Sequence, residues 1–119
     1  MDMKLELVAV PVSDVDRAKA FYTEQAGFHA DHDYTVSDEI RFVQLTPPGS
    51  ACSIAIGKGL TDAAPGSVRG LQLVVTDIEA ARKEFADRGT EISDLTVVGA
   101  DLEEAFLAIT HEAEKETIA

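Results

Sequence analysis

Residues 7–28 read LVAVPVSDVDRAKAFYTEQAGF, a strand pattern followed directly by a helix pattern. The first part is an apolar run rich in β-branched residues, which is typical of a strand. Ser13 is predicted to cap the helix, because Asp16 lies three positions on, where a carboxylate reaches back to the cap. The helix is expected to run to about Gln25 and to stop at Gly27. Its apolar face carries four residues at helical spacing: Ala18, Phe21, Tyr22 and Ala26.

The same succession of signals recurs 63 residues later in the chain. An apolar run over residues 70–75 leads into TDIE at 76–79, which matches SDVD at 13–16. Thr76 is the predicted cap of a second helix, which runs to about Arg88 and stops at Gly89. Its apolar face is Ile78, Ala81 and Phe85. The chain therefore contains two similar units, each of which should continue into further strands.

Further extended segments are predicted at residues 28–35, 40–46, 51–57 and 95–98, from alternating apolar residues and turn signals such as PPGS at 47–50. The C-terminal part shows a different pattern. Asp101 with Glu104 resembles a capping box, and an apolar stripe follows at Leu102, Ala105, Phe106 and Ile109. This pattern predicts a C-terminal helix.

Charge and cysteine content limit the classes of partner. The formal net charge of −12 repels nucleic acids and anionic membranes, so we expect neither as a partner. Cys52 is the single cysteine, so a disulfide within the chain and a site built on several thiolates are both excluded. The first residues show no signal-peptide pattern, and no apolar run is long enough to span a bilayer. We expect a cytoplasmic protein.

The 7–28 segment resembles the opening of the vicinal-oxygen-chelate superfamily, which includes glyoxalases, bleomycin-resistance proteins and extradiol dioxygenases. The features shared are VSD at 12–14, FY at 21–22 and GF at 27–28. The resemblance implies an α+β fold of two βαβββ-type modules that form a curved mixed sheet around a cavity. The whole chain would be one such domain. Its parts would be module one at about 4–59, a linker at 60–69, an incomplete or altered module two at about 70–98, and an atypical tail at 99–119.

The resemblance also implies positions for a metal site. In this superfamily a His or Glu in the first strand of each module holds the metal, with help from the last strands. Those first-strand positions fall on Leu7 and Gly70, and neither residue can bind a metal. We therefore expect no metal, no cofactor and no assigned catalytic residue, although an enzyme is not excluded by the sequence.

Three residues are candidates for binding a ligand in the implied cavity: Arg41, Gln44 and Tyr22. Arg41 and Gln44 lie on a predicted strand, where exposed positions explain them equally well. Tyr22 lies on the apolar face of the first helix, where a core role is the alternative. The HADHD segment at 29–33 favours a solvated edge strand over a metal cluster, because an extended strand separates its two imidazoles.

The resulting hypothesis is a metal-free protein of the bleomycin-resistance kind that binds an unknown small molecule. Two alternatives stay open: a divalent-metal lyase or dioxygenase with unrecognised ligands, and a structural or interaction domain. Because module two is short of strands, its sheet would have an exposed edge and an exposed apolar face. We therefore expect a homodimer.

Overall fold

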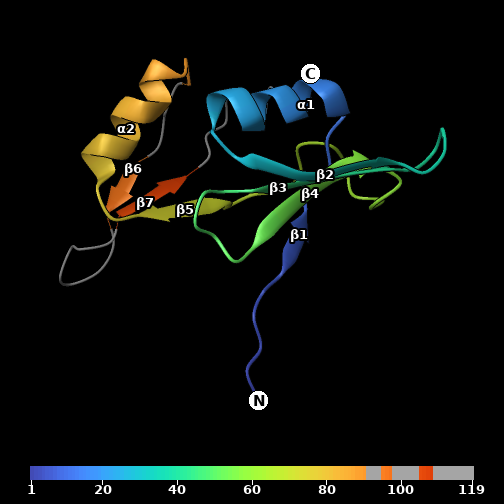
Figure 1. Cartoon of the computed structure of the whole chain (residues 1–119), viewed down its shortest axis with the longest axis horizontal. Helices are drawn as coiled ribbons and strands as arrows, with labels where there is room; N and C mark the ends of the chain where they lie inside the picture. Colours follow the sequence, from blue (N-terminus) through green and yellow to red (C-terminus); the bar gives the residue numbers. More distant parts are fainter. Residues whose placement is uncertain (91–94, 98–104, 109–119) are drawn as a thin grey trace.

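The computed structural model describes residues 1–90, 95–97 and 105–108, in an α+β arrangement that follows the predicted repeat (Figure 1). The elements in chain order are β1 (Leu7–Ala9), α1 (Val15–Ala20), η1 (Phe21–Gln25), β2 (His29–Thr35), β3 (Arg41–Thr46), β4 (Ser53–Lys58), β5 (Gln72–Val75), α2 (Ile78–Asp87), β6 (Leu95–Val97) and β7 (Ala105–Ala108). The short π-helix η1 continues α1 without a break. The predicted α+β class is confirmed.

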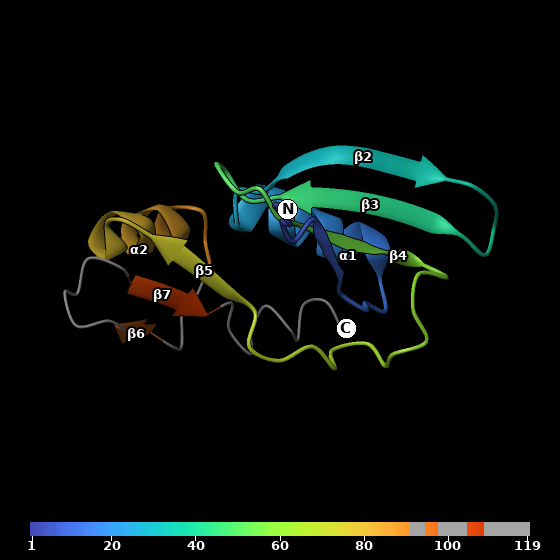
Figure 2. The same ribbon diagram turned by 90° about the horizontal axis from the view of Figure 1, so that it is seen from below.

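The strands form two sheets, which lie next to each other in Figure 2. Sheet A has the order β1-β4-β3-β2, in which β1 runs parallel to β4 and the other pairs are antiparallel. Sheet B has the order β5-β7-β6 and is antiparallel. The predicted mixed sheet is confirmed in sheet A. In the part of the chain that the structure describes, the two modules contribute separate sheets rather than one continuous sheet.

Both helices are capped by an aspartate. The Asp14 side chain accepts a hydrogen bond from the backbone N–H three residues on, at 3.0 Å, and Asp77 does the same. The predicted caps, Ser13 and Thr76, are therefore wrong by one residue. The reason is that Asp14 and Asp77 are the last extended residues before each helix, which is the position from which a side chain reaches the third amide.

The helices end as the sequence predicts. Gly27 and Gly89 have φ angles of 77° and 84°, a conformation that glycine adopts without a steric penalty. The second helix, α2, has 10 residues. None of the helices in the described ranges combines the length and the apolar character needed to cross a membrane.

The core lies between sheet A and the helix formed by α1 and η1. All four apolar residues predicted for the first helix are buried, and Val43 and Leu45 of β3 are completely buried beneath them. The elements from β5 onward join this core only at its margin. Leu73 and Phe85 are partly buried against it, and no residue of α2 is fully buried.

The predicted C-terminal helix is wrong where the structure describes it. Residues 105–108 form β7, which lies between β5 and β6 and pairs with both. Backbone pairing on both sides outweighs the local helical pattern, because tertiary contacts override weak local preferences. The rest of that prediction, including Asp101 and Ile109, lies outside the described residues.

Candidate functional site

Sheet A has two chemically different faces. Strand residues alternate between faces, so Val43 and Leu45 point to α1, whereas Phe42 and Gln44 point the other way. Residues paired across neighbouring strands share a face. The face opposite α1 therefore continues from β3 onto the other strands of sheet A. We call it the open face and define it by Leu7, His32, Tyr34, Phe42, Gln44, Thr46 and Ser53.

An aromatic pair stands on the open face. The rings of His32 and Tyr34 are stacked with centroids 5.3 Å apart and an interplanar angle of 18°. A hydrogen bond of 3.1 Å joins the Tyr34 hydroxyl to Nδ1 of His32. Tyr34 is 56% exposed, and Phe42 lies opposite it on β3. The pair is therefore a fixed, flat aromatic surface that a planar ligand can contact.

This pair was not recognised from the sequence. Asp31, the residue before His32, interrupts the pairing of β2 with β3, where the register shifts between Ala30 and His32. The available signal was the spacing of two between His32 and Tyr34 on a predicted strand, which places both rings on one face.

A hydrogen-bonded row of polar side chains lies beside the aromatic pair. Gln44 donates from Nε2 to the Ser53 hydroxyl at 3.2 Å, and the Thr46 and Ser53 hydroxyls are 2.6 Å apart. Thr46 also donates to the Asp31 carboxylate. Ser53 is buried, so the row is anchored in the sheet. An amide has a second N–H and a carbonyl oxygen, so the oriented Gln44 side chain can present polar groups to a ligand.

The other two predicted ligand-binding residues lie elsewhere. Arg41 is on the helix-facing side of β3, where it donates to Asp33 through Nε and Nη2 at 3.0 and 2.9 Å. It also donates to Asp16 of α1 at 2.7 Å, which ties the helix to the sheet. Tyr22 is 2% exposed and packs in the core against the Phe28 ring. Of the three candidates, Gln44 alone belongs to the open face.

The ion pairs around Asp33 predict a pH dependence of stability. The Arg41 guanidinium, assisted by Lys19, holds the pKa of the Asp33 carboxyl well below its ordinary value of 3.8. Because this pKa is lower in the folded than in the unfolded chain, the pair stabilises the fold above about pH 4. That contribution is lost as the pH falls below this value towards the folded-state pKa.

Asp33→Asn tests this effect. Urea denaturation of the wild type and the variant, from about pH 7 to about pH 2, should show the variant less stable at neutral pH. The difference in the free energy of unfolding between wild type and variant should shrink as the solution is acidified through pH 4. Below this pH the Asp33 carboxyl of the unfolded wild type becomes protonated, which stabilises the unfolded wild type but not the unfolded variant. A difference that stays constant over this range would contradict the assignment.

A comparison with protein families identifies the fold. The model of the Glyoxalase/Bleomycin resistance protein/Dioxygenase superfamily matches residues 4–106. The chain belongs to this superfamily. The resemblance inferred from the segment at 7–28 is thereby confirmed. Among curated proteins, none matches the chain.

Solved structures of the superfamily are similar to the chain. TnmS3, an antibiotic-binding protein from Streptomyces sp. CB03234, is 33% identical with a TM-score of 0.64, over 82% of this chain and 76% of that chain. A glyoxalase/bleomycin resistance protein from the same Streptomyces is 33% identical with a TM-score of 0.62, over 81% and 79%. A superfamily member from Sphaerobacter thermophilus DSM 20745 is 28% identical with a TM-score of 0.65, over 82% and 81%.

The residues of this superfamily member do not fit the metal site that the superfamily implies. Leu7 does lie on the open face of sheet A, opposite Ser53, but its side chain has no donor atom. Gly70 lies before β5 and has no side chain to offer. Among the residues that the structure describes, three or more His, Cys, Asp or Glu side chains nowhere gather into a group that could hold a metal ion. We therefore derive no step through a metal.

Proposed function

We propose that the protein binds a planar small molecule on the open face of sheet A. The observation that carries this proposal is the exposed, stacked pair of His32 and Tyr34 beside the oriented amide of Gln44. The rings offer a flat apolar surface, and the amide offers the directional contact that fixes the ligand's orientation. Membership of a superfamily that contains an antibiotic-binding relative supports a binding role.

The electrostatics of the chain favour a neutral or cationic ligand. The net charge of −12 disfavours approach of an anion. Arg41, the cation nearest in sequence to the open-face residues Phe42 and Gln44, is on the other face and is paired with two aspartates. Asp31 at the edge of the polar row adds negative charge to the open face itself. A nucleic acid or another polyanion is the class of partner that this surface fits worst.

The proposal is tested with antibiotics that do or do not carry flat aromatic rings. Their binding is compared between the wild type and one double variant, His32→Ala with Tyr34→Ala. Daunorubicin and bleomycin, which carry flat aromatic rings, should bind, and erythromycin, which has none, should bind at least about tenfold more weakly. The double variant should lose about tenfold in affinity for the aromatic compounds, because each aromatic contact contributes about 0.5–1.5 kcal/mol beyond its buried area. Isothermal titration calorimetry measures both effects.

Thr35→Ala is the matched control, since Thr35 is exposed on the same strand and pairs with Arg41 on the opposite face of sheet A. It should leave the affinities unchanged. If none of the three compounds binds, or if the control weakens binding as much as the double variant does, the proposed function is wrong.

We further propose that the protein acts in the cytoplasm as a homodimer. β1 is an edge strand of sheet A, and the six residues before it extend away from the body of the molecule (Figure 1). Met3 and Leu5 in this segment are 84% and 70% exposed, and Val74 of β5, an edge strand of sheet B, is 54% exposed. A second copy that covers these surfaces would remove apolar side chains and an open sheet edge from water. The free thiol of Cys52 suits a reducing compartment.

The mass in solution tests the dimer. Light scattering coupled to size-exclusion chromatography should give twice the chain mass of 12.7 kDa. Val74→Asp should shift the distribution towards the single-chain mass, because a charge would be buried at the interface. Arg82→Asp, on the exposed side of α2, is the control and should leave the dimer intact. A single-chain mass for the wild type at micromolar concentration would contradict the proposal.

A further inference from the structure

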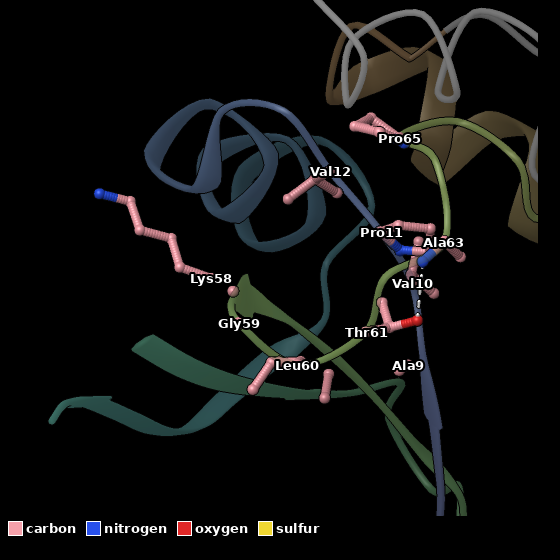
Figure 3. Close-up of a pocket in the computed structure, with 12 residues that line it drawn as sticks. Ala9, Val10, Pro11, Val12, Lys58, Gly59, Leu60, Thr61, Ala63 and Pro65 are labelled. Carbon is pink, nitrogen blue, oxygen red and sulfur yellow. Dashed lines mark hydrogen bonds between the residues drawn. The ribbon is translucent and has the colours of Figure 1, made fainter. Parts of the chain in front are cut away.

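A cavity lies where β1 and β4 end, under the segment that connects β4 to β5 (Figure 3). Its volume is about 310 Å³. This is near the lower end of the range for small-molecule pockets, roughly 300–1,000 Å³. The aromatic pair, His32 and Tyr34, does not line it.

The floor of the cavity is made of very small residues. Ala9 and Ala55 are paired in the β1–β4 register, and Gly57 follows two residues along β4 on the same face. In the β3–β4 register, Gln44 is opposite Ala55 and Phe42 is opposite Gly57. The floor is therefore the direct continuation of the open face, and the cavity exists because these three positions lack larger side chains.

The wall of the cavity is a segment held in place by hydrogen bonds from its backbone N–H groups. Gly59, with a φ angle of 72°, turns the chain at the end of β4. The Ala63 N–H donates to the Thr61 hydroxyl at 3.1 Å. The Gly66 N–H donates to the Pro11 carbonyl at 3.2 Å, which fastens the segment to the end of β1. The cavity is thus enclosed by a defined structure on two sides.

Among the lining residues that the structure describes, none is acidic and one is basic. That basic residue is Lys58, and Figure 3 shows its side chain extending away from the cavity. Thr61 supplies a hydroxyl group, and the other lining side chains are aliphatic, prolyl or absent. Polar contacts therefore come from the main chain and from Thr61. A charged group would lose its hydration here without gaining an opposite charge, which is costly.

We infer that this cavity is a second subsite, which takes a compact, neutral ring group of about bicyclic size. The inference rests on the proposed function, because it extends the binding surface of the open face by one partly enclosed pocket. The ring group would pack on the Ala9, Ala55 and Gly57 floor and would form hydrogen bonds with the main chain at the wall.

Indole, a neutral bicyclic ring, is the probe. Titrated into ¹⁵N-labelled full-length protein, it should shift the backbone amide signals of Ala9, Gly57, Gly59 and Thr61, with a Kd of about 1 mM, as expected for a ligand of this size. Tryptamine and indole-3-acetate add a positive and a negative charge to the same ring. Both should bind at least about tenfold more weakly at these residues.

Ala63→Trp and Ala64→Trp form a matched pair of variants. Both positions are exposed neighbours in the connecting segment, but only Ala63 lines the cavity. Ala63→Trp should fill the cavity and abolish the indole-induced shifts, and Ala64→Trp should preserve them. The amide spectrum of each variant without indole shows whether it is folded. Equal loss of the shifts in two folded variants would overturn the inference.

The outcomes separate this inference from the proposed function. If indole leaves the cavity signals unchanged while daunorubicin still shifts the signals of His32 and Tyr34, the second subsite is wrong and the proposed function stands. If indole binds in the cavity while the aromatic antibiotics do not bind the open face, the cavity site is supported and the proposed function is wrong.

Discussion

Gly57→Ala is expected to lower the free energy of unfolding by about 3 kcal/mol, a large loss for one methyl group. A Cβ atom at Gly57 would overlap the main-chain oxygen of Arg41, on the neighbouring strand. That oxygen is part of the β3–β4 ladder, so it cannot move without separating the strands. The side chain of Leu60 would also be approached, at 3.0 Å, but a flexible side chain can give way. Urea denaturation monitored by circular dichroism measures the loss.

Gly49→Ala is the control for this prediction. Gly49 has a φ angle of 77°, and no atom lies within 4 Å of the position of an added Cβ. Its loss should be about 1–2 kcal/mol, which is the cost of a left-handed conformation alone. Losses of the same size in the two variants would show that the close approach to Arg41 is not the reason for glycine at position 57.

Leu45→Ala is expected to cost about 2–5 kcal/mol of stability, because it removes a large side chain from the centre of the core and leaves a cavity. Leu45 is 0% exposed and faces α1 from near the end of β3. The same denaturation experiment should show a lower midpoint with an unchanged dependence on urea concentration. A reduced slope would indicate that the variant no longer unfolds in one step.

Val36→Ala serves as the reference for the core variant. Its side chain is 70% exposed, so the loss should stay within about 0.5 kcal/mol. If Leu45→Ala were as stable as Val36→Ala, the assignment of β3 to the centre of the core would be wrong.

Local patterns determined the outline of the fold. The repeat at an offset of 63 residues, the two helices with their glycine stops, and the apolar face of the first helix are all confirmed by the structure. Each depends on interactions between residues a few positions apart, such as a cap and its third amide. Such short-range contacts can be predicted from the sequence alone. The predicted cap of the first helix was wrong by one residue, because Asp14 and not Ser13 caps it.

The open face is set by contacts between residues that are far apart in the sequence. Alternation along β3 already separates Arg41 from Gln44, but it does not tell which face a helix covers. Packing of α1 and the ion pairs to Asp16 and Asp33 decided that Arg41 faces the helix. Pairing of β2 with β3 decided that Tyr34 stands beside Phe42.

The end of the described chain shows the same limit most clearly. The apolar residues around Phe106 recur at helical spacing, so the local sequence predicts a helix. A short segment considered alone shows only this local preference. In the structure this segment is β7, with a neighbouring strand on each side. The sequence thus determined the repeated order of strand, helix and glycine stop and the amphipathic first helix, whereas the tertiary structure decided the cap residues, the open face and the last strand. The physical reason is that hydrogen bonds between strands far apart in sequence override the weaker preferences of a short segment.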